Sequence, residues 1–208
     1  MYDQSSTIRS FLDAAAAKQP APGGGSVTAL AGALSASMGE MVLNYSLGKK
    51  GLEDYQEELK PVLAEFHRAR QVLVELMAED QQAYAELTAA RKLPENAPER
   101  ADTFPAALTA CIRAPQAMAA TGLAILELCD RVVNFVNPHL LSDLAVCADL
   151  AMATVRCAIY NVRVNLPDVT DDAERQRFEA ATSELLAKAA VLIQQVAPRI
   201  WVRHGQGT

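Results

Sequence analysis

Residues 18–26 read Lys-Gln-Pro-Ala-Pro-Gly-Gly-Gly-Ser, and they separate a short amphipathic segment from a long, almost uncharged one. The two prolines fix their φ angles, while three successive glycines lack the Cβ atoms that would keep other groups away from the backbone. Ser26 is a good N-cap for a helix over 27–47, and the unpaired N–H groups at a helix start attract anions. The stretch therefore predicts a ligand-binding turn at the head of a helix, with a flexible linker as the alternative.

The helix predicted after this turn lies at the centre of the fold. Between Val27 and Leu47 the only charge is Glu40. The length and apolar character would suit a membrane span, but the segment is rich in Ala, Gly and Ser rather than bulky aliphatic residues, and the rest of the chain has no membrane-flanking pattern. Small residues let neighbouring helices approach closely. We therefore expect a central helix of a bundle and no membrane partner.

Helical periodicity continues along the rest of the chain. Ala is abundant and aromatic residues make up only 5% of the sequence, which favours helices over a β-sandwich. Gly48 is expected to end the central helix, and Pro94 and Pro98 mark a loop over 91–102. Further helices are expected over 6–18, 52–91 with a bend at Pro61, 103–136 with a kink at Pro115, from Leu140 or Asp143 to 164, and from Thr170 or Asp171 to about 199. The sequence predicts one all-α domain over 1–208, a bundle of about six helices with long antiparallel members.

Composition excludes several classes of protein. The net charge of -6 argues against a general nucleic-acid binder, which needs a basic face. The four cysteines lie in apolar helical patterns without a C-x-x-C pair, so we expect buried, reduced thiols in a cytoplasmic protein rather than disulfides or zinc: Cys111, Cys129, Cys147 and Cys157. The N-terminus does not have the layout of a signal peptide.

Polar residues in three places are candidates for a site. Asp80 lies on a long charged helix, where such a residue is commonly solvated. Asp143 opens a helix after the polar turn 137–142, and helix capping alone would explain it. Arg156 and Asn161 lie among apolar neighbours, so they must reach water or find partners. Their helix is therefore a candidate wall of a polar pocket.

Six motifs occur together, in order, over almost the whole chain. They are Pro-x-Pro-Gly-Gly-Gly-Ser at 20–26, Gly-Lys-Lys at 48–50, Glu-Asp-x-x-Ala-Tyr at 79–84, Lys-Leu-Pro at 92–94, Asn-Pro-x-Leu-x-Ser-Asp at 137–143 and Arg-x-Ala-x-x-Asn-Val-Arg-x-Asn-Leu at 156–166. This combination resembles the formiminotransferase-cyclodeaminase-like family, in its cyclodeaminase domain. The resemblance implies an all-helical homodimer that acts on a folate.

The resemblance also implies which residues form the site. A tetrahydrofolate derivative is the expected substrate, held by Gly23, Gly24, Gly25, Ser26 and Lys49, with Asp80, Asp143, Arg156 and Asn161 in or near the site. Of the two carboxylates, Asp143 is expected to be the principal acid–base residue, ahead of Asp80 and His139. Lys49 and Arg156 suit the carboxylates of the glutamate tail. The chemistry needs proton transfer and charge stabilisation, so no metal is expected.

The expected activity is that of a methenyltetrahydrofolate cyclohydrolase, which adds water to 5,10-methenyltetrahydrofolate and yields 10-formyltetrahydrofolate. The alternative is a formimidoyltetrahydrofolate cyclodeaminase, which releases ammonia and forms the methenyl compound. The motifs do not separate the two, and a chain without a formiminotransferase domain favours the first. A third hypothesis, of another class, is a helical dimer that lost catalysis and serves as a binding module. The shortened region 95–113, interrupted by Pro98 and Pro105, supports that hypothesis.

Overall fold

The computed structural model describes residues 2–3 and 5–206, and within these ranges it contains helices but no strand. Six α-helices follow one another as α1 (Ile8–Ala16), α2 (Gly24–Asn44), α3 (Gln56–Lys92), α4 (Pro98–Val132), α5 (Leu141–Arg163) and α6 (Asp172–Gln206). Short 3-10 turns lie at Glu53–Tyr55, Pro138–Leu140 and Leu166–Asp168. The predicted all-α bundle of about six helices is confirmed.

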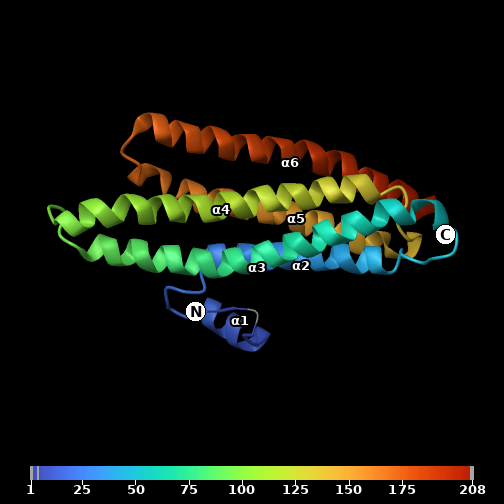
Figure 1. The fold of residues 1–208 in the computed structure, drawn as a ribbon, viewed down its shortest axis with the longest axis horizontal. Coiled ribbons are helices and arrows are strands. Elements are labelled where there is room, and N and C mark those ends of the chain that lie inside the picture. Colours follow the sequence, from blue (N-terminus) through green and yellow to red (C-terminus); the bar gives the residue numbers. More distant parts are fainter. Residues whose placement is uncertain (1, 4, 207–208) are drawn as a thin grey trace.

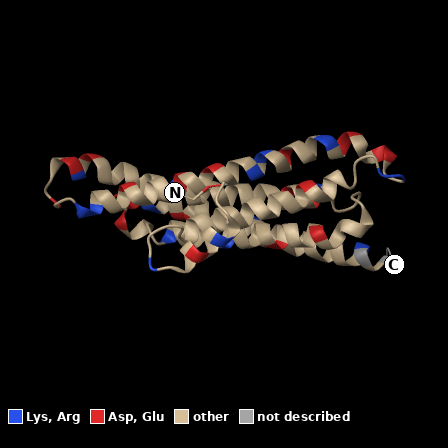
Figure 2. Ribbon diagram, turned by 90° about the horizontal axis from the view of Figure 1, so that it is seen from below, with Lys and Arg blue, Asp and Glu red and all other residues tan. Residues whose placement is uncertain are grey.

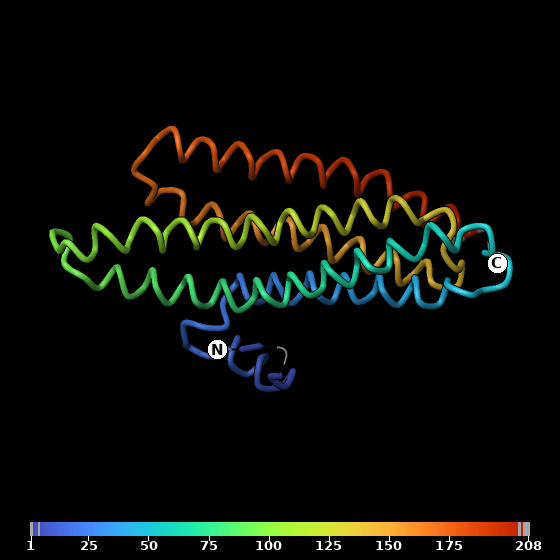
Figure 3. The backbone as a smooth tube through the Cα atoms, in the orientation of Figure 1, coloured from blue at the N-terminus to red at the C-terminus, as the bar shows by residue number. Residues whose placement is uncertain are grey.

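Four helices form the centre of the bundle, because α2 packs on α3 and α5, and α4 packs on the same two helices. In Figure 1, α3 and α4 lie in front and α2 and α5 behind them, while α6 runs along one edge against α4 and α5. Acidic and basic residues are spread along the length of the bundle (Figure 2). The backbone trace in Figure 3 shows that α3 and α4 extend past the start of α2 and that α1 lies outside the bundle.

Close contact between α2 and α3 depends on three glycines spaced seven residues apart. A Cβ on each would lie within 3 Å of a side chain of α3, and the partners also recur every seven residues, in the opposite direction: Gly25 with Asp80, Gly32 with Leu73, and Gly39 with Phe66. Because the helices are antiparallel, this matching spacing sets one register for the whole contact. The small residues of α2 thus serve close packing, as the sequence predicts.

Several predicted boundaries are wrong by about one turn. The helix after the glycine turn begins at Gly24, with Gly23 as N-cap, so Ser26 lies inside the first turn and is not the cap. It ends at Asn44 rather than at Gly48, which follows in a left-handed turn with φ 69°. The loop after α3 is shorter than the predicted 91–102. Pro98, predicted to lie in this loop, is instead the first residue of α4. Proline is tolerated there since the first helical N–H has no partner inside the helix.

The two ends of the chain also differ from the prediction. On α1, Phe11 and Ala14 are buried, whereas Ile8 and Leu12, whose helical spacing with Phe11 predicts that they share its apolar face, are 80% and 59% exposed. α6 starts where expected, since the Asp171 carboxylate accepts hydrogen bonds from the N–H groups of Ala173 and Glu174. The helix then continues to Gln206 instead of fraying after Arg199.

The burial of individual residues shows that one prediction about the cysteines is wrong and accounts for the apolar composition of α2. Cys111, Cys129 and Cys147 are buried free thiols, as predicted, but Cys157 is exposed. α2 and the 172–203 part of α6 are long and apolar enough to cross a membrane by length and composition. In α2, 56% of the apolar window is buried inside the bundle, as in a core helix.

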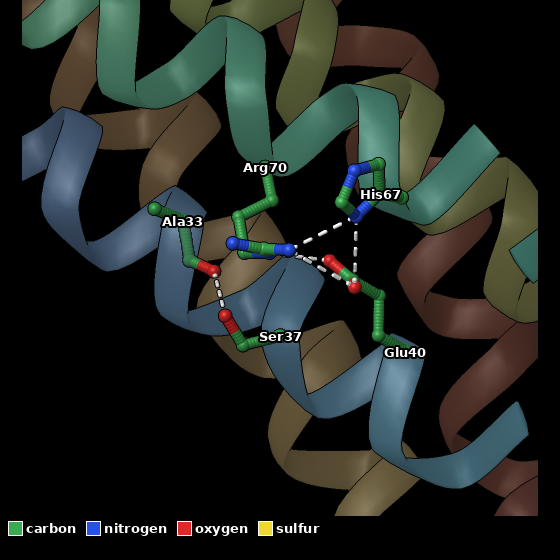
Figure 4. A network of polar contacts seen from close by, with 5 residues as sticks. All are labelled: Ala33, Ser37, Glu40, His67 and Arg70. Carbon is green, nitrogen blue, oxygen red and sulfur yellow. Dashed lines mark hydrogen bonds and ion pairs between the residues drawn. The ribbon is translucent and has the colours of Figure 1, made fainter. Parts of the chain in front are cut away.

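Glu40, the single charge of α2, is held by α3. Its carboxylate accepts hydrogen bonds from the guanidinium of Arg70 and lies 3.3 Å from Nδ1 of His67 (Figure 4). Burial alone would raise the pKa of Glu40, but the hydrogen bonds from Arg70 and His67 outweigh it and keep the pKa below its usual value. The polar network therefore joins α2 to α3 beside the glycine contacts.

We predict that Gly39→Ala destabilises the bundle, although Ala is the better helix former. The new Cβ would lie 2.3 Å from Cε1 of Phe66, so the ring or the helix must move, which typically costs about 1–3 kcal/mol. Denaturant unfolding of both proteins measures the loss. Gly205→Ala on α6 is the control, because its Cβ meets no atom within 4 Å. Equal stability of the Gly39 variant and the parent would contradict the close-packing account.

Candidate active site

A cavity of about 310 Å³ lies at the start of α2, where α3, α4 and α5 surround it. One of its lining residues, Cys111, belongs to a smaller apolar cluster that also includes Leu87, Ile112 and Val162. Its walls are formed by Pro20, Ala21, Gly23, Gly24, Gly25, Ser26, Asp80, Gln81, Tyr84, Arg91, Cys111, Pro115, Asn161, Val164 and Asn165. The predicted glycine turn, Asp80 and Asn161 are therefore brought together, from segments far apart in the sequence.

The glycines of the turn make room for polar side chains of the chain itself. A Cβ on Gly25 would lie 2.0 Å from Oδ1 of Asp80, and a Cβ on Gly24 would lie 3.0 Å from Oδ1 of Asn161. The sequence predicts that the missing Cβ atoms let a ligand approach the backbone. In the structure, two of them instead allow an acid and an amide to lie against the first turn of α2, at the edge of the cavity.

Asp80 lies in an environment that disfavours its charge. Burial raises the pKa of the Asp80 carboxyl to about 6, against the opposing effect of the hydroxyl and backbone N–H of Ser26. Burial is the larger effect, and the buried Oγ of Ser26 makes no hydrogen bond of good geometry. The result is a carboxyl group that can both accept and release a proton near neutral pH.

Two asparagines of α5 and its C-terminal end form the facing wall. Nδ2 of Asn161 donates to the Cys157 carbonyl and lies 3.4 Å from Oγ1 of Thr28 on α2. Asn165 donates to the carbonyls of Asn161 and Cys111. These bonds use the amide N–H groups, so the side-chain oxygen of Asn161 remains directed at Gly24 and the cavity edge.

Three predicted site residues do not line the cavity. Asp143 lies at the other end of α5, about 27 Å from Asn161 along the helix. Lys49 follows the end of α2, where the backbone N–H of Asn137 donates to Ser46 and so joins this turn to the start of α5. Arg156 is exposed on α5 outside the cavity. The cavity thus gathers Asp80, Asn161 and the glycine turn, and the roles predicted for the three residues outside it stay predictions.

Other lining residues were not predicted as site residues. Tyr84 and Arg91 lie four and eleven residues after Asp80, on the same face of α3, so helical periodicity alone could have indicated them. Arg91 also pairs with Asp168, at 2.6 Å. Cys111 carries no such signal in the sequence. In the described part of the chain no three His, Cys, Asp or Glu side chains group to hold a metal ion.

The chain is an all-helical bundle whose cavity is lined by a titratable carboxyl, two amides and a glycine turn. The chain belongs to the formiminotransferase-cyclodeaminase family, whose model matches residues 7–184.

Individual relatives agree with this family. A methenyltetrahydrofolate cyclohydrolase of Methylorubrum extorquens is 32% identical over 91% of this chain and 93% of its own length. The formimidoyltransferase-cyclodeaminase of Rattus norvegicus is 32% identical over 88% of this chain, which spans 35% of that longer enzyme. The crystal structure of a formiminotetrahydrofolate cyclodeaminase from Thermotoga maritima superposes with a TM-score of 0.87 at 27% identity, covering 94% of this chain and 96% of that one.

We predict that Asp80→Asn stabilises the protein at high pH. The folded-state pKa of about 6 lies above the ordinary 3.8, so the folded protein binds this proton more tightly and stability falls as pH rises between these values. Above about pH 6 the parent protein bears the full free-energy cost of keeping an ionised Asp80 in the folded state. A pKa difference of two units corresponds to a loss of at most about 3 kcal/mol in the free energy of unfolding. Thermal midpoints across pH 4 to 8 measure the effect. The increase in thermal midpoint of Asp80→Asn over the parent should shrink toward pH 4. A difference in midpoint that does not change with pH would contradict the raised pKa of Asp80.

Proposed function

We propose that the protein is a methenyltetrahydrofolate cyclohydrolase. The observation that carries this proposal is the carboxyl of Asp80 at the cavity, buried beside the start of α2 and with a pKa raised to about 6. The cyclohydrolase of Methylorubrum extorquens, matched over 93% of its length, supports this choice of reaction.

The proposed reaction adds water to the cationic methenyl carbon that bridges N5 and N10 of the substrate. The Asp80 carboxylate accepts a proton as the water oxygen bonds to that carbon, which gives a neutral tetrahedral intermediate. The protonated Asp80 then returns the proton to N5 as the carbon–N5 bond breaks, leaving the formyl group on N10. A second proton is released from the hydroxyl as the formyl C=O forms. A carboxylate near the cation also stabilises the substrate's positive charge.

The size of the cavity indicates which part of a folate it would hold. At about 310 Å³ it is at the lower end of ligand pockets, so it suits the pterin and the one-carbon bridge, with the glutamate tail outside. Asn161 and the glycine turn would contact the bridge and the pterin. Arg91, at the rim, and Arg156, exposed on α5, are the cations available to the tail carboxylates.

Formimidoyltetrahydrofolate cyclodeaminase is the second candidate, favoured by the similarity to the Thermotoga maritima and Rattus norvegicus proteins. In that reaction N10 attacks the formimino carbon, and protonated Asp80 would donate a proton to the departing ammonia. The same cavity and the same carboxyl serve both reactions. A binding module without catalysis is less well supported, because such a module has no use for a carboxyl that is costly to ionise.

We also propose that the protein is a homodimer in the cytoplasm. Large apolar side chains are exposed along α2 and α5, which is uncommon for a monomer when they are contiguous. The three buried free thiols suit a reducing compartment.

The reaction is tested by the absorbance of methenyltetrahydrofolate with purified protein. Loss of absorbance with methenyltetrahydrofolate alone identifies the cyclohydrolase, and its appearance from the formimino substrate identifies the cyclodeaminase. Asp80→Asn should lower turnover a hundredfold or more, since Asn cannot transfer the proton. For the parent protein, kcat/KM should rise with pH through about 6 as Asp80 ionises. Turnover of neither substrate by the folded parent protein would exclude both reactions.

A further inference from the structure

The chain before Gly23 lies outside the bundle and folds back on it. This part of the chain, residues 2–3 and 5–22, includes α1, and we call it the N-terminal arm (Figure 1). Phe11 of the arm is buried in the main hydrophobic core. The ring of Tyr2 meets the ring of Phe11 edge-on, with the two centroids 5.9 Å apart. The two aromatic side chains thus provide an apolar contact between the arm and the bundle.

The side chain of Gln81 on α3 is the hydrogen-bonding partner of the arm. Its Oε1 accepts from the backbone N–H of Tyr2 at 2.7 Å, and its Nε2 donates to the Tyr2 carbonyl at 2.8 Å. Gln81 is only 6% exposed, so these bonds are shielded from water. Within the described residues, they are the only hydrogen bonds between the arm and the bundle. We call this pair of bonds the Gln81 clamp.

A carboxamide suits this position because it carries an acceptor and a donor in one plane, as the backbone of the bound residue does. The second N–H of Nε2 donates to the Met77 carbonyl at 3.0 Å. The oxygen and both N–H groups of Gln81 therefore have partners inside the protein. Although Gln81 lines the cavity, it has no N–H left to donate to a substrate, and the clamp accounts for its amide.

Both ends of the arm lie beside the same turn of α3. The first end is held by Gln81 through the backbone of Tyr2. At the other end the chain passes residues 20–21, which line the cavity, and reaches Gly25, whose backbone packs against Asp80. Successive side chains of a helix point about 100° apart. Two neighbouring residues of α3 therefore contact the two ends of the arm, and one of them is the titratable carboxyl of the cavity.

The arm has the properties of a segment that opens locally. Segments with few buried contacts and few hydrogen bonds to the rest of a protein open most readily, and lids that close on ligands belong to this group. The outer side of α1 is exposed, and the arm depends on the aromatic contact and on the Gln81 clamp. Residues 20–21 belong to the arm and to the cavity wall, so opening of the arm opens the cavity.

We infer that Gln81 is a positioning residue that fastens the N-terminal arm over the cavity, and that the arm closes on the pterin of a reduced folate. With the clamp formed, residues 20–21 complete the outer wall of the cavity. With the clamp broken, the wall opens and a bound folate leaves more easily. Gln81 acts through the arm and does not touch the reacting atoms. The identity of the ligand rests on the proposed function, but the clamp does not.

The clamp is tested without substrate, because trypsin can cleave the arm after Arg9 and Lys18, which are both exposed. Gln81→Met keeps the length of the side chain but removes its hydrogen bonds. Cleavage at the two sites should therefore be faster by about tenfold, as expected for one or two net hydrogen bonds lost. Gln82→Met is the matched control, since Gln82 is exposed and bonds to Glu86 of its own helix. Equal cleavage of Gln81→Met and the parent overturns the inference.

Closure on a ligand is tested in the parent protein, with 5-formyltetrahydrofolate as a stable reduced folate. A ligand that binds the closed arm lowers the open fraction, so a saturating concentration should slow cleavage after Lys18 by about tenfold or more. Cleavage of a small peptide by the same trypsin controls for inhibition of the protease. Binding detected by calorimetry without slower cleavage overturns closure. Absence of binding overturns the folate as ligand and the proposed function with it, while the cleavage rates of the free proteins still decide the clamp.

Turnover of methenyltetrahydrofolate separates positioning from catalysis. In Gln81→Met, KM should rise by about tenfold while kcat changes by less than about threefold, because Asp80 is intact and the loss falls on binding. Dissociation of 5-formyltetrahydrofolate, followed by stopped flow, should become faster in the same variant. Gln82→Met should match the parent in both measurements. A lower kcat with unchanged KM would show that Gln81 acts on the reacting atoms or through Asp80, and it would overturn the inference.

Discussion

The antiparallel contact between α2 and α3 sets the geometry on which the remaining structure depends. Glycine at every seventh position of α2 removes the side chain that would separate the helices, and an α3 side chain occupies each of the three spaces. Since the partners on α3 are also seven residues apart, a slip of one residue would bring Phe66 and Leu73 against backbone that carries a Cβ. This packing allows a single register between α2 and α3. α5 then packs on α2, and α4 packs on α3 and α5, which completes the four-helix bundle.

The same contact explains the position of Asp80. In the deep part of the bundle the side chains received by the glycines are Leu73 and Phe66, whereas at the open end the third is a carboxyl. Asp80 is therefore held by the packing that orders the apolar residues, rather than by hydrogen bonds designed for a charge, and its proton is retained to a higher pH. A bundle thus raises the pKa of an acid by placing it at an apolar packing position next to a cavity.

A long helical bundle also separates residues that chemistry would bring together. Helices of 21 to 37 residues put the two ends of each element tens of ångströms apart, so a single subunit cannot have Asp80 and Asp143 in one cavity. The cavity of the chain therefore contains one of the two predicted carboxyls, Asp80, and not the other.

The sequence by itself determined the helical class, the approximate extent of most helices and the importance of the glycine turn, because periodicity and the local properties of Gly, Pro and Ala act within a few residues. It did not determine the ends of α2, the exposure of Cys157 or the face of α1 that packs, since these depend on neighbours distant in the chain. Nor could it decide that Gly25 makes room for Asp80 while Asp143 lies at the far end. Only the tertiary structure decides this, because the separation of two residues in a bundle depends on helix direction and register, which local propensities do not encode.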